Sequence, residues 1–213
     1  MDIFQSEIFA NMSYIVASML FIFGLKQLGS PETAQRGNLI SASGMSLAVL
    51  VTLINSQIIS YEWLAAGLIL GVIVGASAAS LVKMTSMPEL VALFNGFGGI
   101  ASLLVGSAEY LGANSLGLIS LTAIFLTLII GGVTFSGSLV AYGKLSEILP
   151  GRQITFLGQR IVLIAVFLLS LVLGAQLIFG FELFQVWNPM YSFSFLILLA
   201  LIIGLLITLP IGG

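Results

Sequence analysis

Long apolar runs separated by short polar segments dominate this chain. Each run approaches the roughly 20 residues that an α-helix needs to cross the hydrocarbon core of a bilayer. We expect seven spans, at residues 8–28, 39–59, 63–82, 88–106, 116–141, 161–181 and 190–209. The connections are too short for a soluble domain, and the period-two alternation of membrane strands is missing. The pattern therefore predicts an all-α protein, a polytopic bundle of about seven transmembrane helices.

Composition supports a membrane protein and removes several kinds of chemistry. The 213 residues are 59% hydrophobic and only 7% charged, whereas a soluble domain carries roughly 25% charged residues. The chain has no cysteine and no histidine, so thiol catalysis, thiolate metal sites and the commonest proton shuttle are excluded. A net charge of −2 gives no reason to expect nucleic acid. The first apolar run has no basic residue before it, so we expect a retained helix, not a cleaved signal peptide.

Basic residues fall on one side of the predicted bundle. The six are Lys26, Arg36, Lys83, Lys144, Arg152 and Arg160, all in or beside the first, third and fifth connections. The other side carries acidic residues alone. Because cytoplasmic connections are enriched in Lys and Arg, the N-terminus is predicted outside and the C-terminus in the cytoplasm.

Small residues recur at helical spacing in the third span. Gly71, Gly75 and Ala79 are four residues apart, so they share one face of a helix. Small residues at this spacing let two membrane helices approach closely. We expect Gly71 and Gly75 to serve helix packing.

The fourth and fifth spans each present a face of small and polar residues. The two sets are Asn95, Gly99, Ser102 and Gly106, and Thr127, Gly131, Thr134 and Ser138, both at i, i+4, i+7 and i+11. Such faces point at protein or water, not at lipid. A packing role remains open, because Ser and Thr often bond to their own helix backbone. Asn95 fits that role less well, because its amide needs several partners. The two faces suit a path for protons or ions.

Two further motifs lie at the start of the fourth span. Glu89 follows Pro88 in "MPEL", which is typical of a first helical turn, where a carboxylate complements the helix dipole. Glu89 is also an ionisable group close to the polar face. The run "GFGGIA" at 96–101 matches a loose dinucleotide-binding pattern, but that pattern requires a preceding strand. A nucleotide site is therefore not expected there.

Three longer blocks carry a resemblance to a known family. They are "YIVASMLFIFGLKQLGSPETAQRGNLI" (14–40), "KMTSMPELVALFNGFGG" (83–99) and "GGVTFSGSLVAYGKL" (131–145). In content, order and spacing they resemble the membrane part of the beta subunit of proton-translocating NAD(P) transhydrogenase. That family couples hydride transfer from NADH to NADP⁺ to proton movement, and soluble domains of the complete enzyme hold NAD(H) and NADP(H).

The resemblance implies roles for particular residues. Asn95 matches a position at which some relatives carry a proton-handling histidine, and Ser138 matches a serine lining the same channel. Thr134 and Ser102, which share the two small and polar faces, and Glu89 are also expected on that path. Asparagine cannot change its charge near neutral pH, so a titrating group is expected first on a membrane helix of the alpha subunit, with Glu89 as the only local alternative in this span. Glycines at 99 and 131 are expected to pack the helices.

The cytoplasmic cations have two interpretations. Lys83, Lys144 and Arg152 face the side on which a nucleotide-binding domain would dock, so the resemblance makes them candidates for coupling to it. Alternatively, they only determine membrane topology.

The resemblance also sets expectations for the whole chain. Residues 1–213 are expected to form one transmembrane proton-translocating domain, without the remaining spans and the NADP(H)-binding domain of the family. This piece should bind no cofactor itself. The expected partners are the alpha subunit, a second protomer and the bilayer of a bacterial inner membrane. The alternatives are an independent secondary transporter or channel, or a structural membrane subunit.

Overall fold

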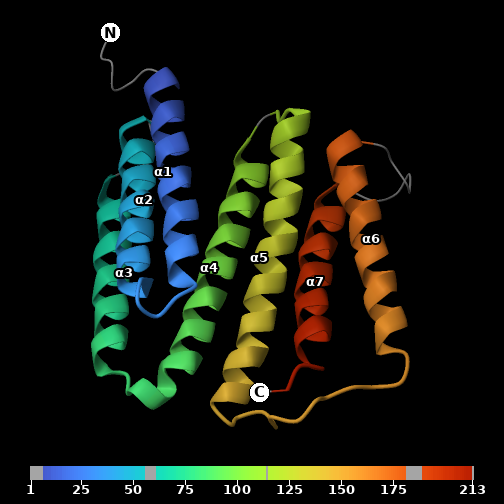
Figure 1. The fold of residues 1–213 in the computed structure, drawn as a ribbon. Helices are drawn as coiled ribbons and strands as arrows, with labels where there is room; N and C mark the ends of the chain where they lie inside the picture. The colour runs from blue at the N-terminus through green and yellow to red at the C-terminus, as the bar shows by residue number, and fades with distance from the viewer. Residues whose placement is uncertain (1–6, 56–60, 114, 181–188, 213) are drawn as a thin grey trace. The chain divides into compact units, whose positions relative to one another are not determined.

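The structure is a computed structural model that describes residues 7–55, 61–113, 115–180 and 189–212. In this described part of the chain, seven α-helices and one 3-10 turn follow one another (Figure 1): α1 (Glu7–Leu28), α2 (Ala34–Asn55), α3 (Tyr61–Leu81), η2 (Met84–Ser86), α4 (Met87–Gly112), α5 (Leu118–Leu145), α6 (Gln159–Phe179) and α7 (Pro189–Thr208). Within these described residues, each of the seven helices is long and apolar enough to cross a membrane. The predicted all-α membrane fold is confirmed.

The helix ends differ from the predicted spans where polar residues continue a helix. α2 begins at Ala34, five residues before the predicted span, and α4 continues to Gly112, six residues beyond it. Hydropathy marks the part of a helix that lies in lipid, whereas backbone hydrogen bonds continue into the membrane interface. The predicted end of the second span, at residues 56–59, lies outside the described residues.

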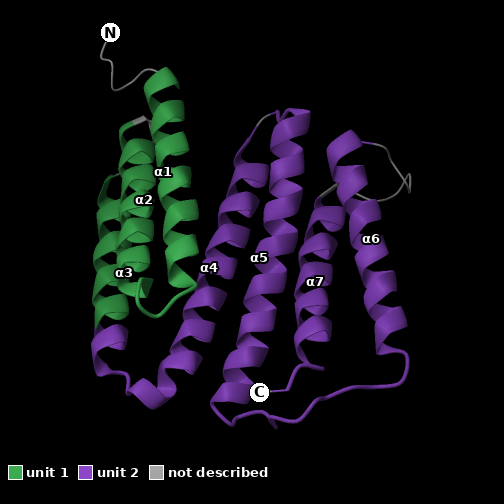
Figure 2. Ribbon diagram, viewed as in Figure 1, with its two compact units in different colours: residues 1–76 green, residues 77–213 purple. Residues whose placement is uncertain are grey.

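The chain divides into two compact units, residues 1–76 and 77–213 (Figure 2). In the first unit, α1 packs against α2 through small residues. Ala10, Ala17 and Gly24 are buried on one face of α1. A Cβ built on Gly44 of α2 would lie only 2.9 Å from the carbonyl oxygen of Ala17. The small residues therefore let the two backbones approach closely.

The α3 helix has a different environment. It buries no residue, and apart from the adjoining backbone of α3 no described atom lies within 4 Å of a Cβ built on Gly71 or Gly75. The packing role of these two glycines therefore stays a prediction, because no other described helix lies against this face of α3.

In the second unit, α5 contacts three helices: α4, α6 and α7. Its apolar core joins residues of α4, α5, α6 and α7: Leu103, Ile124, Phe125, Leu128, Leu173, Phe193, Leu196 and Leu199. The rings of Tyr110 and Phe193 stack with their centroids 4.5 Å apart. Glycines with positive φ stand at both ends of α6, Gly158 at 84° and Gly180 at 66°, where a side chain would be strained. This arrangement places α5 between α4 and α7.

Candidate functional site

The two small, polar faces predicted on the fourth and fifth spans meet between α4 and α5. A Cβ built on Gly99 would lie 2.8 Å from the carbonyl oxygen of Gly131 and 3.0 Å from the Cβ of Thr134. Further along, a Cβ on Gly106 would lie 3.1 Å from Cγ2 of Thr127. The helices therefore run antiparallel in close contact, with glycine of one opposite threonine or glycine of the other. We call this contact the α4–α5 seam.

One hydrogen bond between side chains crosses the seam. Nδ2 of Asn95 donates to Oγ of Ser138 at 2.8 Å. Gly96 makes room for it, since a Cβ there would lie 3.2 Å from the Cβ of Ser138. The Ser138 side chain is buried, whereas the Asn95 side chain is exposed. Asn95 is eight residues into α4, which places the pair about 12 Å from the start of that helix.

The remaining predicted path residues do not join this pair directly. Ser102 is exposed, and its hydroxyl donates to the carbonyl of Gly98 in its own helix at 3.0 Å. Glu89 lies in the first turn of α4. Six residues separate Glu89 from Asn95, so it lies about 9 Å away along the axis and about 120° around the helix. Thr134 lies in the seam beside Gly99.

Other hydroxyl groups of α5 bond within their own helix. Oγ1 of Thr127 donates to the carbonyl of Ala123 at 2.8 Å, and Oγ of Ser136 donates to the carbonyl of Gly132 at 3.0 Å. This bonding pattern is typical of Ser and Thr in a packed membrane helix. It fits the packing alternative for these two residues, and separates them from Asn95 and Ser138.

A second contact of α5, with α7, was not predicted. A Cβ on Gly132 would lie 2.7 Å from the Cβ of Ala200, and a Cβ on Gly204 would overlap Oγ of Ser136. A Cβ on Gly137 would lie 2.8 Å from Oγ1 of Thr208. The sequence carries a signal for this contact, because small residues stand four positions apart on each helix, at 132 and 136 on α5 and at 200 and 204 on α7. The α5 helix therefore has two small-residue faces.

The three predicted coupling cations have different surroundings. Lys83 and Arg152 are exposed. Lys144 is only 5% exposed, and its Nζ donates to carbonyl oxygens of Leu209 at 2.7 Å, of Ile211, and of Arg152 at 3.4 Å. A direct contact from this ammonium to another domain would require these bonds to break.

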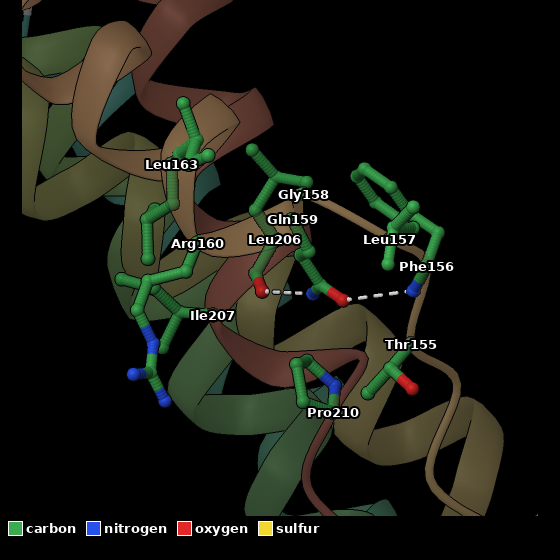
Figure 3. A pocket seen from close by; sticks show the side chains of 11 residues that line it. Thr155, Phe156, Leu157, Gly158, Gln159, Arg160, Leu163, Leu206, Ile207 and Pro210 are labelled. Atoms are coloured by element: carbon green, nitrogen blue, oxygen red, sulfur yellow. Dashed lines mark hydrogen bonds between the residues drawn. The ribbon is translucent and has the colours of Figure 1, made fainter.

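A pocket of about 620 Å³ lies where the α5–α6 connection meets the start of α6 and the end of α7 (Figure 3). Gln159 hydrogen-bonds two other lining residues: Nε2 donates to the carbonyl of Leu206 at 2.9 Å, and Oε1 accepts from the backbone N–H of Phe156 at 3.4 Å. The lining includes none of the residues predicted for a proton path. We treat the α4–α5 seam as the candidate site.

The fold and the seam define a multi-pass membrane protein whose helices pack through small residues. A family model described as NAD(P) transhydrogenase beta subunit matches residues 10–213. The chain belongs to that family, as the resemblance predicted.

Two curated relatives agree with the family model. NAD(P) transhydrogenase subunit beta of Rhodospirillum rubrum, and the protein of that name from its strain ATCC 11170, are each 36% identical to this chain over 209 residues. The match covers 94% of this chain and 44% of each relative. The chain thus spans less than half the length of these relatives.

Proposed function

We propose that this chain is the proton-conducting membrane part of an NAD(P) transhydrogenase beta subunit. In the complete enzyme it would couple proton translocation to hydride transfer from NADH to NADP⁺. The observation that carries the proposal is the hydrogen bond between Asn95 and Ser138 across the α4–α5 seam. The family resemblance independently implies a role on the proton path for these same two residues.

The two side chains can bind and orient water but cannot store a proton as charge. An amide offers two N–H donors and an acceptor oxygen, and a hydroxyl offers one donor and two acceptor lone pairs. One amide donor of Asn95 is used by Ser138. The carbonyl oxygen of Asn95 would accept from water, and the Ser138 hydroxyl would pass its own hydrogen onward. A titrating group must come from another helix, and the open side of Asn95 offers a place for one.

The proposed partners follow from the name of the family. A beta subunit pairs with an alpha subunit, whose membrane helix would approach Asn95 and supply the titrating group. NAD(H) and NADP(H) would bind to soluble domains of the complete enzyme. The assembled protein would lie in a bacterial inner membrane as a dimer of protomers.

One observation favours a purely structural membrane subunit instead. The hydroxyls of Thr127 and Ser136 bond within their own helix, as residues that only pack would do. Under that alternative the Asn95–Ser138 bond joins two helices and no proton passes.

The effect of a proton gradient on hydride transfer in membrane vesicles distinguishes the two functions. The complete enzyme containing this chain is assembled with its alpha subunit, and hydride transfer from NADH to NADP⁺ is followed with and without a proton gradient. Asn95→Leu should lower the gradient-stimulated rate at least about tenfold, the equivalent of about 1.4 kcal/mol in barrier height. Phe94→Leu, at the neighbouring position of α4, is the matched control and should retain the rate. Full stimulation in Asn95→Leu would exclude this residue from the path.

A further inference from the structure

Lys144 is a buried cation in the last turn of α5, and its surroundings are unusual for a residue that only sets membrane topology. Topology requires a positive charge on the correct side, which an exposed lysine such as Lys83 supplies equally well. Burial removes an ammonium from water and is costly unless hydrogen bonds replace that water. Here, three carbonyl oxygens surround Nζ.

Two of those carbonyls belong to the chain that leaves α7. The helix ends at Thr208. Lys144 donates to the carbonyls of Leu209 and Ile211, just past this end. A positive charge at a helix C-terminus is also favoured by the helix dipole. The ammonium therefore binds the segment just past the end of α7 from a different helix.

The connection between α5 and α6 takes part in the same cluster. The carbonyl of Arg152 accepts from Lys144, and the backbone N–H of Ile154 donates to the carbonyl of Leu209 at 3.1 Å. One side chain thus joins three segments: the end of α5, the connection that follows it, and residues 209–211 after α7.

The same helix carries the seam. Ser138 precedes Lys144 by six residues, which is about 9 Å along α5. A shift of α5 that changes the Asn95–Ser138 bond would therefore move the ammonium, and with it the segment after α7.

We infer that Lys144 is a positioning residue that fixes residues 209–211 to α5, so that the seam and the chain leaving α7 move together. The fixation itself stands on the hydrogen bonds described above. Its importance for proton coupling rests on the proposed function. Lys144 acts through the backbone that follows α7 and touches no substrate.

A cysteine pair measures the fixation directly. A Cβ on Gly212 would lie 4.0 Å from Cγ of Gln153, so cysteine side chains at these two positions would be neighbours, and the chain has no cysteine of its own. The double variant Gln153→Cys/Gly212→Cys is placed in the assembled complex in native membranes, and formation of the bridge is timed after an oxidant is added. Lys144→Met should slow it about tenfold, because the three carbonyl acceptors lose the ammonium that joins them. Lys83→Met is the matched control and should leave the rate unchanged.

A functional ratio separates positioning from general loss of structure. The hydride-transfer rate with a proton gradient is divided by the rate without one. Lys144→Met should lower this ratio, whereas a variant that merely reduces the amount of folded enzyme lowers both rates together. Lys144→Arg keeps the charge and several donors, so it should restore much of the ratio. If Lys144→Met does not accumulate in membranes, Lys144→Gln replaces it, since it keeps donors but no charge.

The outcomes are distinct. Unchanged bridge formation in the neutral variant overturns the inference. Slower bridge formation with an unchanged ratio overturns the coupling role. Slower bridge formation in an enzyme whose unmodified form ignores the gradient overturns the proposed function and supports the fixation alone.

Discussion

Gly99 of α4 and Gly131 of α5 lie in backbone contact: a Cβ built on either would lie 2.8 Å from the carbonyl oxygen of the other. No side chain fits at that separation, so only glycine permits it. Close approach of this kind is a main source of helix association in membranes, where dispersion replaces the hydrophobic effect.

Gly99→Ala should therefore destabilise the second unit. The added methyl group meets backbone atoms of α5, which cannot rotate away, and overpacking of this kind costs about 1–3 kcal/mol. Gly98→Ala is the matched control, because among the described residues no atom beyond the adjoining backbone of its own helix lies within 4 Å of a Cβ at that position. Thermal unfolding of the membrane complex checks the difference. Equal losses of stability in the two variants would contradict the backbone contact.

Ser138→Ala should weaken the seam by a smaller amount. It removes the acceptor of the Asn95 amide, and hydrogen bonds between membrane helices contribute about 0.6 kcal/mol on average. Ser107→Ala is the control, since that hydroxyl bonds only the carbonyl of Leu103 in its own helix. A double-mutant cycle with Asn95→Ala isolates the pairwise free energy. Strictly additive losses would show that the two side chains do not interact.

The predicted membrane orientation is tested with single cysteines in a chain that has none. Gln153→Cys lies in the α5–α6 connection and should react with an impermeant maleimide only from the cytoplasmic side, because the basic residues flank that connection. Gly112→Cys, at the end of α4, should react only from the outside. Labelling is compared in intact cells and in inverted vesicles. Reactivity of both positions from one side would refute the orientation.

The α3 helix offers a test of packing with a partner. Gly71→Leu should reduce the amount of assembled complex, since small residues four apart usually mark a helix contact. Ile73→Leu, on the opposite face of α3 and also exposed, should leave assembly unchanged. The amount of complex is measured after mild solubilisation. Full assembly with Gly71→Leu would show that this face carries no contact.

The helical periodicity of small and polar residues predicted the central part of the candidate site. Seven spans followed from hydropathy, and the small residues at i, i+4, i+7 and i+11 on two spans predicted the faces that meet in the α4–α5 seam. Spacing alone could not find the edges of that seam. Ser102 shares the predicted face with Gly99 but is exposed, because a helix contact covers only part of such a face.

The surroundings of Lys144 could not be predicted from the residues next to it in the sequence. Two of its three carbonyl acceptors lie 65 and 67 residues further along the chain, and they are backbone atoms, which carry no sequence signal. The position of a lysine in a connection predicts a topological role. Only the fold shows that the end of α7 reaches the same place.

Neighbouring glycines on α5 serve two different contacts: Gly131 meets α4, whereas Gly132 meets Ala200 of α7. A side chain at either position would push α5 towards its other neighbour, so a change on one side cannot be relieved on the other. If both codons are randomised together and functional chains are selected, glycine should return at both. Ala200→Gly should widen the choice at 132 alone. The tolerance of α5 to change is thus set separately at adjacent positions, each by a different partner helix.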